Sequence, residues 1–237
     1  MQSDLAIVIL NYNTCHLLNT YLPSVVKHSN GYRIIFVDNA SKDESVNFVR
    51  ENYQQIEVIC LEENYGFTGG YNRALKQIKA KYYCLLNTDV EVTENWIEPI
   101  INLMEGDEKI AVCQPKLLSY TEKNKFEYAG AAGGFIDYLG YPFCAGRIFD
   151  TIEEDKGQYN EIQEIFWASG AAFFIRSELY HQFGGLDENY FAHFEEIDLC
   201  WRLKNEGYKI YCNPNSIVYH LGGGTLNKTF PFKTYLN

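Results

Sequence analysis

Four short stretches of the sequence carry side chains that could do chemistry. They are Asp89 in LLNTDV, Asp38 in FVDNASKD, the carboxylates of FEEIDLCWR, and His220 in VYHLGGGT. Carboxylates and imidazoles can ligate a divalent cation, accept hydrogen bonds from a nucleotide, or take a proton from a reacting hydroxyl. Which of these applies depends on the elements that position the side chains.

The composition predicts one acidic globular domain. The chain has 237 residues, of which 46% are hydrophobic, and a formal net charge of −11. That length suffices for one core. The negative charge argues against nucleic acid or an anionic membrane surface as the main ligand, but a nucleotide can still bind through a bridging cation.

The cysteines and the N-terminal stretch indicate a cytoplasmic protein. The seven cysteines are scattered, their number is odd, and no C-x-x-C pattern occurs, so we expect reduced thiols rather than disulfides or a zinc site. The start MQSDLAIVILNYN has the pattern of a strand rather than a signal peptide. No stretch approaches the roughly 20 apolar residues needed to cross a bilayer.

The first half of the chain alternates between short apolar runs and helix-like stretches. We predict strands at 5–10, 33–38, 56–61, 82–87 and 110–117, and helices at 15–29, 43–52, 69–80 and 93–104, the last with Thr93 as N-cap. This order is typical of an α/β protein with a mostly parallel, Rossmann-like central sheet and helices on both faces. The region 118–164, rich in Gly and Tyr and then acidic, predicts a long excursion.

Polar clusters follow four of the predicted strands, at residues 11–13, 38–43, 63–72 and 87–89. Open α/β sheets bind ligands at the carboxyl ends of their strands, so we expect these clusters to meet in one crevice. There, Asp89 could hold Mg²⁺ or Mn²⁺ or simply cap a turn, and Asp38 could bind a base or ribose or cap the next helix. Gly69 and Gly70 open a helix that could face phosphate, although neither G-x-G-x-x-G nor a P-loop is present.

The stretch FEEIDLCWR predicts a helix that begins with three carboxylates. These residues suit the positive end of a helix dipole, and Asp198 and Arg202 form an ordinary i,i+4 pair, so a purely structural interpretation is available. The aromatic, glycine-rich approach GGLDENYFAHF instead suggests a pocket in which a carboxylate has a raised pKa and acts as a general base. His220, before three glycines, is either a core residue or a ligand.

Taken together and in this order, the motifs resemble a family-two glycosyltransferase of the GT-A fold. They are IVILNYN, VDNASKD, ENYGFTGGYN, LLNTDV, the run from ASGAAFFIRSELYHQFGGLDENYF to AHFEEIDLCWRLKNEGYKI, and VYHLGGGT. The resemblance spans roughly residues 5–235 and is greatest for the bacterial branch that includes rhamnosyltransferases and galactofuranosyltransferases.

The resemblance implies roles for individual positions. Glu196 would be the catalytic base within the Glu195-Glu196 pair, with Asp198 as the alternative base, and Asp89 and His220 would hold Mg²⁺ or Mn²⁺. Trp167, Ser169 and Gly170 would face the donor sugar or the acceptor. The nucleotide-binding residues would be Leu10, Asn11, Tyr12, Asn13, Asp38, Asn39, Asn64, Gly69, Asn72, Asn87 and Thr88. Two positions depart from the family pattern, because Asn87 replaces the first Asp of D-x-D and Glu196 replaces the usual Asp.

The resemblance implies an inverting, metal-dependent transfer of a sugar from a UDP- or dTDP-linked donor. The acceptor would be a hydroxyl of a saccharide or a lipid-linked molecule, and the reaction would serve the synthesis of cell-surface polysaccharide or glycolipid. The alternatives are a non-catalytic sugar-nucleotide-binding or scaffold protein and a sugar-phosphate nucleotidyltransferase. The latter would need a basic, Gly-rich loop after the first strand, where this chain has NYNTCH.

We expect a single domain over 1–237, with a nucleotide-binding half at 1–117 and an acceptor and catalytic half at 118–237. Related chains usually continue with further helices, so we expect the sequence to be truncated at its C-terminus. The full-length protein would be cytoplasmic, with peripheral association at the inner face of the membrane as the alternative.

Overall fold

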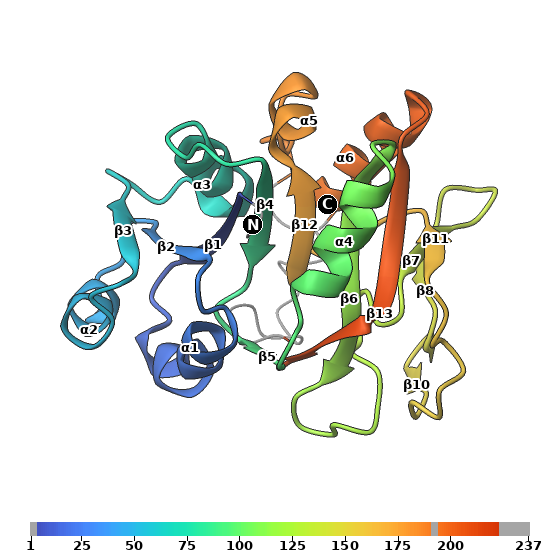
Figure 1. The fold of residues 1–237 in the computed structure, drawn as a ribbon, viewed down its shortest axis with the longest axis horizontal. Helices are drawn as coiled ribbons and strands as arrows, with labels where there is room; N and C mark the ends of the chain where they lie inside the picture. Colours follow the sequence, from blue (N-terminus) through green and yellow to red (C-terminus); the bar gives the residue numbers. More distant parts are fainter. Residues whose placement is uncertain (1–3, 191–193, 223–237) are drawn as a thin grey trace.

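The structure is a computed structural model, and it describes residues 4–190 and 194–222. Its centre is a nine-stranded sheet with the order β11-β13-β6-β12-β4-β1-β2-β3, in which β5 pairs with β13 (Figure 1). The strands are β1 (Leu5–Asn11), β2 (Arg33–Asp38), β3 (Glu57–Cys60), β4 (Tyr82–Leu86), β5 (Val90–Val92), β6 (Ile110–Ser119), β11 (Gln163–Ile165), β12 (Ala172–Arg176) and β13 (Lys209–His220).

The sheet is mixed but mostly parallel, as the sequence predicted. Strands β1 to β4 pair in parallel, as do β6 and β13. Strand β12 lies between β4 and β6 and is antiparallel to both, so β4 and β6 point the same way. Because β12 runs in the opposite direction, the residues just before it lie at the edge where β4 and β6 end.

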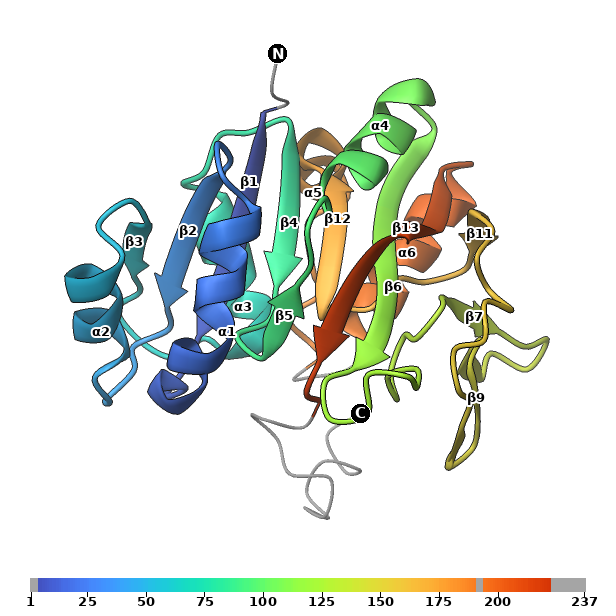
Figure 2. The ribbon, with the colours of Figure 1, turned by 60° about the horizontal axis from the view of Figure 1, so that its bottom comes forward.

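Helices cover both faces of the sheet (Figure 2). One face carries α1 (Cys15–His28), α2 (Ser45–Asn52) and α4 (Glu98–Gly106), and the other carries α3 (Gly66–Leu75), α5 (Ser177–Gln182) and α6 (Glu195–Asn205). Each layer has its own apolar core. Leu18, Leu22 and Ile100 belong to the first, and Tyr71, Leu179 and Leu199 belong to the second. Alternate side chains of a strand point to opposite faces, so the apolar strands serve both cores.

Two predicted helices have different bounds in the structure. Helix α4 begins at Glu98 rather than at 93, and its N-cap is Ile97. Thr93 is not a cap, because its hydroxyl donates to the Ile217 carbonyl 2.7 Å away and the preceding residues form β5. Helix α3 begins at Gly66 and ends at Leu75, so it starts and ends earlier than predicted.

The excursion between β6 and β12 contains short strands rather than irregular chain. Two of them, β7 (Gly134–Ile136) and β8 (Pro142–Cys144), form one small hairpin, and β9 (Arg147–Ile148) and β10 (Thr151–Ile152) form another. The excursion returns to the main sheet through β11. In the part of the chain that the structure describes, no helix has both the length and the apolar character that crossing a membrane requires.

Candidate active site

The ends of β1 and β2 are joined by hydrogen bonds between predicted nucleotide-binding residues. The buried Asn11 amide donates to Asp38 Oδ1 at 3.0 Å and to Ser41 Oγ at 2.9 Å. Thr14 donates its hydroxyl to Asn11 Oδ1, and the Ser41 N–H donates to Asp38 Oδ2 at 3.0 Å. The Asp38 carboxylate is therefore fixed at the edge of the sheet where β1 and β2 end, and both of its oxygens accept hydrogen bonds.

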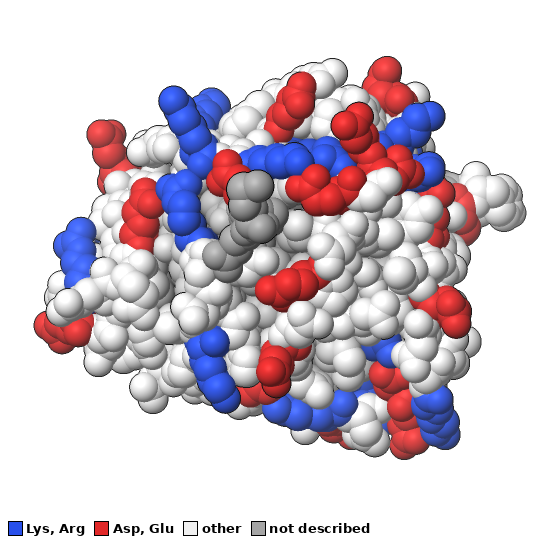
Figure 3. All heavy atoms as spheres, in the orientation of Figure 1, with Lys and Arg blue, Asp and Glu red and all other residues white. Residues whose placement is uncertain are grey.

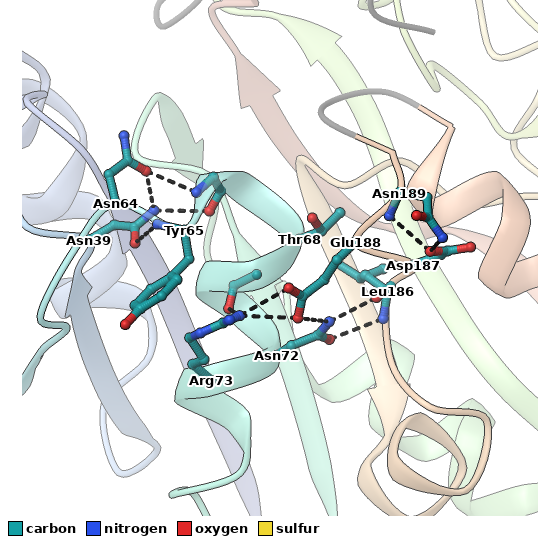
Figure 4. A network of polar contacts seen from close by, with 12 residues as sticks. Asn39, Asn64, Tyr65, Thr68, Asn72, Arg73, Leu186, Asp187, Glu188 and Asn189 are labelled. Carbon is teal, nitrogen blue, oxygen red and sulfur yellow. Dashed lines mark hydrogen bonds and ion pairs between the residues drawn. The ribbon is translucent and has the colours of Figure 1, made fainter.

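Asn39 connects the ends of β1 and β2 to the start of α3. Its amide nitrogen donates to Asn64 Oδ1 and to the Gly66 carbonyl, each at 2.9 Å, and its oxygen accepts from the Tyr65 N–H at 3.1 Å (Figure 4). Gly70 permits the close approach, because a Cβ there would lie 3.0 Å from both Leu10 methyls. Three of the four predicted polar clusters are thus in direct contact.

Asn72 lies on α3 but contacts the segment that leads to α6. Its amide donates to the Leu186 carbonyl at 2.8 Å and to Glu188 at 3.2 Å, and its oxygen accepts from the Tyr180 hydroxyl at 2.7 Å and from the Leu186 N–H at 3.1 Å. Glu188 also pairs with Arg73 at 3.0 Å (Figure 4). All hydrogen-bonding positions of the buried Asn72 amide are therefore used within the protein, and its contact with a nucleotide stays a prediction.

Asp89 and His220 meet where β4 and β13 end. The distance from His220 Nε2 to Asp89 Oδ1 is 3.1 Å, and only 3% of Asp89 and 9% of His220 are exposed. The other ring nitrogen, Nδ1, lies 3.4 Å from Oε1 of Glu127, a buried carboxylate in the excursion. Burial by itself would lower the pKa of His220, but its contacts with Asp89 and Glu127 outweigh that effect and raise the pKa to about 10.

The Asp89 and His220 side chains are joined by a hydrogen bond or ion pair, and they also have the chemistry of two ligands of one divalent cation. Two donor atoms in adjacent octahedral positions, each about 2.1 Å from the ion, are about 3.0 Å apart. The observed separation of 3.1 Å fits that spacing. Within residues 4–190 and 194–222, no three His, Cys, Asp or Glu side chains converge on one metal position. Among the described residues, Asp89 and His220 are therefore the two side chains that could hold a divalent cation here.

The carboxylates Glu195 and Glu196 lie at the start of α6, next to the segment before β12. Glu196 Oε1 accepts from the Gly170 N–H at 3.2 Å, and a Cβ on Gly170 would lie 3.2 Å from the same oxygen. Oε2 of each carboxylate is buried without a hydrogen-bond partner among the described residues. Burial, together with repulsion from Glu196, raises the pKa of Glu195 to about 9, and burial also raises the pKa of Glu196. The Asp198 carboxylate instead pairs with Arg202 at 2.7 Å.

The three predicted sugar or acceptor residues lie on the chain segment that enters β12. The Trp167 ring packs against Gly134 and donates to the Phe135 carbonyl at 2.8 Å. Ser169 donates to the Ala129 carbonyl at 2.9 Å, and its N–H donates to Gln114 at 2.9 Å. Gly170 contacts Glu196 directly, whereas Trp167 and Ser169 mainly fix the position of the segment. Their contacts with a sugar stay predictions.

The remaining predicted residues lie around the same edge. Asn13 has a left-handed backbone conformation with φ of 55°, and its side chain accepts from the Lys42 N–H at 2.7 Å. Tyr12 is exposed, Thr88 is buried, and the Asn87 N–H donates to the Ala171 carbonyl at 3.1 Å. Residues 191–193 of the aromatic approach, the last glycines of VYHLGGGT and the C-terminal stretch lie outside the described residues.

The sequence suggested no individual role for several residues that hold the site together. Ser41 and Thr14 orient Asn11, Gln114 holds Ser169, and Glu127 faces His220. Glu127 occurs in FEYAGAAGG, which carries no motif, and its contact with His220 depends on the pairing of β13 with β6. On the face shown in Figure 3, basic side chains lie beside acidic ones rather than gathering in a patch.

A family model described as Glycosyl transferase family 2 matches residues 6–183, so the chain belongs to this family. One relative is the low-salt glycan biosynthesis hexosyltransferase Agl10 of Haloferax volcanii, 22% identical over 89% of this chain and 64% of the relative. Another is the N-acetylglucosaminyl-diphospho-decaprenol L-rhamnosyltransferase of Mycobacterium tuberculosis, 22% identical over 93% of this chain and 76% of the relative.

Solved glycosyltransferase structures share the fold, which is the GT-A fold. GalNAc-T7 with UDP, GalNAc and Mn²⁺ has a TM-score of 0.71 at 16% identity, over 92% of this chain and 44% of that one. The mannosyltransferase PcManGT of Pyrobaculum calidifontis with GDP-Man and Mn²⁺ has a TM-score of 0.63 at 12% identity, over 93% and 57%. The chain therefore spans about half the length of these two proteins and about two thirds of the archaeal relative.

Proposed function

We propose that the protein is an inverting, metal-dependent hexosyltransferase. It would move a sugar, with rhamnose as one candidate, from a UDP- or dTDP-linked donor to a hydroxyl of a saccharide or lipid-linked acceptor in cell-surface polysaccharide or glycolipid synthesis. Residues 1–117 would bind the nucleotide, and residues 118–237 would provide the acceptor site and the base. The names of the hexosyltransferase and rhamnosyltransferase relatives support this proposal.

The observation that carries the proposal is the Asp89–His220 pair, buried at the strand ends with a ligand-like spacing of 3.1 Å. Asp89 and His220 would hold Mg²⁺ or Mn²⁺. When bound, this cation supplies Lewis-acid stabilisation of the departing diphosphate. Two solved neighbours of the same fold carry Mn²⁺ together with a nucleotide or nucleotide sugar, which supports this assignment.

The donor's base and ribose would lie over the β1 and β2 ends. Asp38 is held by Asn11 and by the Ser41 N–H, so its carboxylate is already oriented before any ligand arrives. An oriented acceptor loses little freedom when it takes a hydrogen bond from a nucleobase or hydroxyl. The network of Asn39 and Asn64 would fix the loop that faces the ribose and diphosphate.

Glu196 would take the proton of the acceptor hydroxyl as it attacks the anomeric carbon from the face opposite the leaving diphosphate. One oxygen of Glu196 is held by the Gly170 N–H and the other has no hydrogen-bond partner among the described residues, which suits an acceptor of a proton. Burial raises its pKa, and a raised pKa makes the ionised carboxylate a stronger base. Asp198 is less suited, because Arg202 occupies its carboxylate.

The first test is a thermal-shift measurement with UDP, dTDP and GDP, each with and without Mn²⁺, on the wild type and on Asp89→Ala. A ligand at 100 times its dissociation constant stabilises the folded state by about 2.7 kcal/mol. We expect one nucleotide to stabilise the wild type only with Mn²⁺, and no stabilisation of the variant. A matching sugar nucleotide should then be turned over by the wild type and not by Asp89→Ala.

Three outcomes would contradict the proposal in different ways. If nucleotides stabilise without Mn²⁺, the metal assignment is wrong. If Mn²⁺-dependent binding occurs but no acceptor or water consumes the donor, the chain is a sugar-nucleotide-binding protein without catalysis. If Asp89→Ala retains full transfer activity, the cation is held elsewhere.

A further inference from the structure

Glu127 is a buried carboxylate that none of the proposed steps uses. Only 5% of the residue is exposed, and it lies in the excursion, far in sequence from the other site residues. A carboxylate is costly to bury unless it has partners, so its position calls for a physical reason. The ring of His220, which lies beside it in the fold, is that partner.

The backbone fixes Glu127 in place. Its N–H donates to the Leu117 carbonyl of β6 at 3.1 Å, and one carboxylate oxygen, Oε2, accepts from the Ala129 N–H at 2.5 Å. The second oxygen, Oε1, lies 3.4 Å from His220 Nδ1, which is within ion-pair distance but without hydrogen-bond geometry. Strand β13 pairs with β6, which brings His220 opposite Ser119, close to the same stretch of β6. Both partners are thus anchored to β6.

Gly222 leaves the space that this contact needs. A Cβ on Gly222 would lie 2.9 Å from Oε1 of Glu127, closer than side-chain carbons normally come, and the residue has a φ of +67° that favours glycine. The chain therefore turns after His220 in a way that keeps the carboxylate beside the ring.

The two nitrogens of the His220 ring face two different carboxylates. Nε2 faces Asp89 at 3.1 Å and Nδ1 faces Glu127 at 3.4 Å. These nitrogens point away from each other, so Nδ1 cannot ligate a cation that is bound to Nε2. A cation that binds Nε2 must displace the proton there, and a carboxylate at Nδ1 then keeps the remaining ring proton on Nδ1, so that the lone pair of Nε2 is left on the Asp89 side.

We propose that Glu127 is a positioning residue that sets the tautomer and orientation of His220 for metal binding. This inference rests on the proposed metal site at Asp89 and His220. Glu127 acts through the imidazole and does not touch the cation or the substrate. A glutamine at this position keeps an oxygen for the Ala129 N–H, but its amide can donate to Nδ1 and so favours the tautomer whose Nε2 carries the proton.

The experiment is a titration of the protein with Mn²⁺, followed by the electron paramagnetic resonance signal of the free aqueous ion. It is done without nucleotide and with saturating UDP, dTDP or GDP. We expect Glu127→Gln to weaken Mn²⁺ binding by about 10- to 100-fold, the usual effect of losing such a partner of a histidine ligand. Gly222→Ala, which presses on the same oxygen from the other side, should weaken it in the same direction.

The control variants separate this inference from the metal site itself. Glu164→Gln removes a carboxylate paired with Lys204 at the surface and should leave Mn²⁺ affinity unchanged. Asp89→Asn should abolish binding. Melting curves without metal show whether each variant folds. If Glu127→Gln does not fold, Gly222→Ala still tests the contact between Glu127 and His220.

The outcomes are distinguishable. If Asp89→Asn loses Mn²⁺ while folded Glu127→Gln and Gly222→Ala bind it as the wild type does, the inference about Glu127 is overturned and the proposed metal site stands. If the wild type binds no Mn²⁺ under any condition, or Asp89→Asn binds it normally, the proposed metal site and the role of Glu127 fall together.

Discussion

Replacing Asn72 by alanine tests whether this side chain holds the two halves of the site together. Its amide joins α3 to α5 and to the segment between α5 and α6 through four hydrogen bonds, one with Tyr180 of α5, two with Leu186 and one with Glu188. Truncation leaves the N–H and carbonyl of Leu186 and the Tyr180 hydroxyl without these partners in a buried environment.

The expected loss of stability follows from those contacts. A net contribution of about 1 kcal/mol per hydrogen bond gives a decrease of about 3 to 4 kcal/mol in the free energy of unfolding. For a protein of this size, that corresponds to a fall on the order of 10 °C in the melting temperature. Urea denaturation at neutral pH measures the free energy directly.

The matched control is Asn189→Ala in the same segment. Asn189 is exposed, and among the described residues its side-chain amide donates to Asp187 alone, so its loss should change stability by less than about 0.5 kcal/mol. A decrease below about 1 kcal/mol for Asn72→Ala would refute the reasoning. Unchanged stability together with a large loss of nucleotide affinity would instead support the role that the sequence suggested for Asn72.

Two further predictions concern the carboxylates of α6. Because Glu195 has a pKa of about 9 in the fold, the folded state keeps a proton that the unfolded chain loses, so this group costs stability as the pH rises from about 4.5 towards 9. Glu195→Gln should remove that cost. The urea midpoints of the variant and the wild type should therefore agree near pH 5, and at pH 8.5 the midpoint of the variant should be higher. A constant difference between the two midpoints across this pH range would contradict the prediction. Gly170→Ala places a carbon 3.2 Å from Glu196 Oε1 and should lower kcat for sugar transfer with little change in melting temperature; an unchanged kcat would show that Gly170 does not position Glu196.

Much of the fold of residues 1–117 could be predicted from the sequence, for a physical reason. In that half, strands and helices mostly alternate, β1 pairs with β2 and β2 pairs with β3, the next strand in the chain each time, and polar residues mark the strand ends. The apolar runs at 5–10, 33–38 and 82–87 therefore gave the strands nearly to the residue. Helix starts were less accurate, since Thr93 has the chemistry of a cap but its hydroxyl is taken by β13.

The rest depends on contacts between distant residues, which local patterns do not encode. Nothing in the sequence of β12 reveals that it lies between β4 and β6, and nothing in FEYAGAAGG reveals that Glu127 meets His220. The motifs supplied the candidate residues, but the partners that orient them, such as Ser41 for Asn11 and Gln114 for Ser169, come from other elements. The sequence therefore indicated the candidate site residues more fully than the residues that orient them.

The insertion of β12 also has a consequence for the order in which the chain can fold during synthesis. Residues 172–176 pair with residues 82–86, so β4 has no neighbour on that side until the ribosome has made most of the chain. Until then, the apolar edge of β4 is open to pairing with other nascent chains. A fragment of residues 1–117 would keep that edge permanently exposed, so we expect it to aggregate when it is expressed alone, although it carries most of the motifs on which the family resemblance rests.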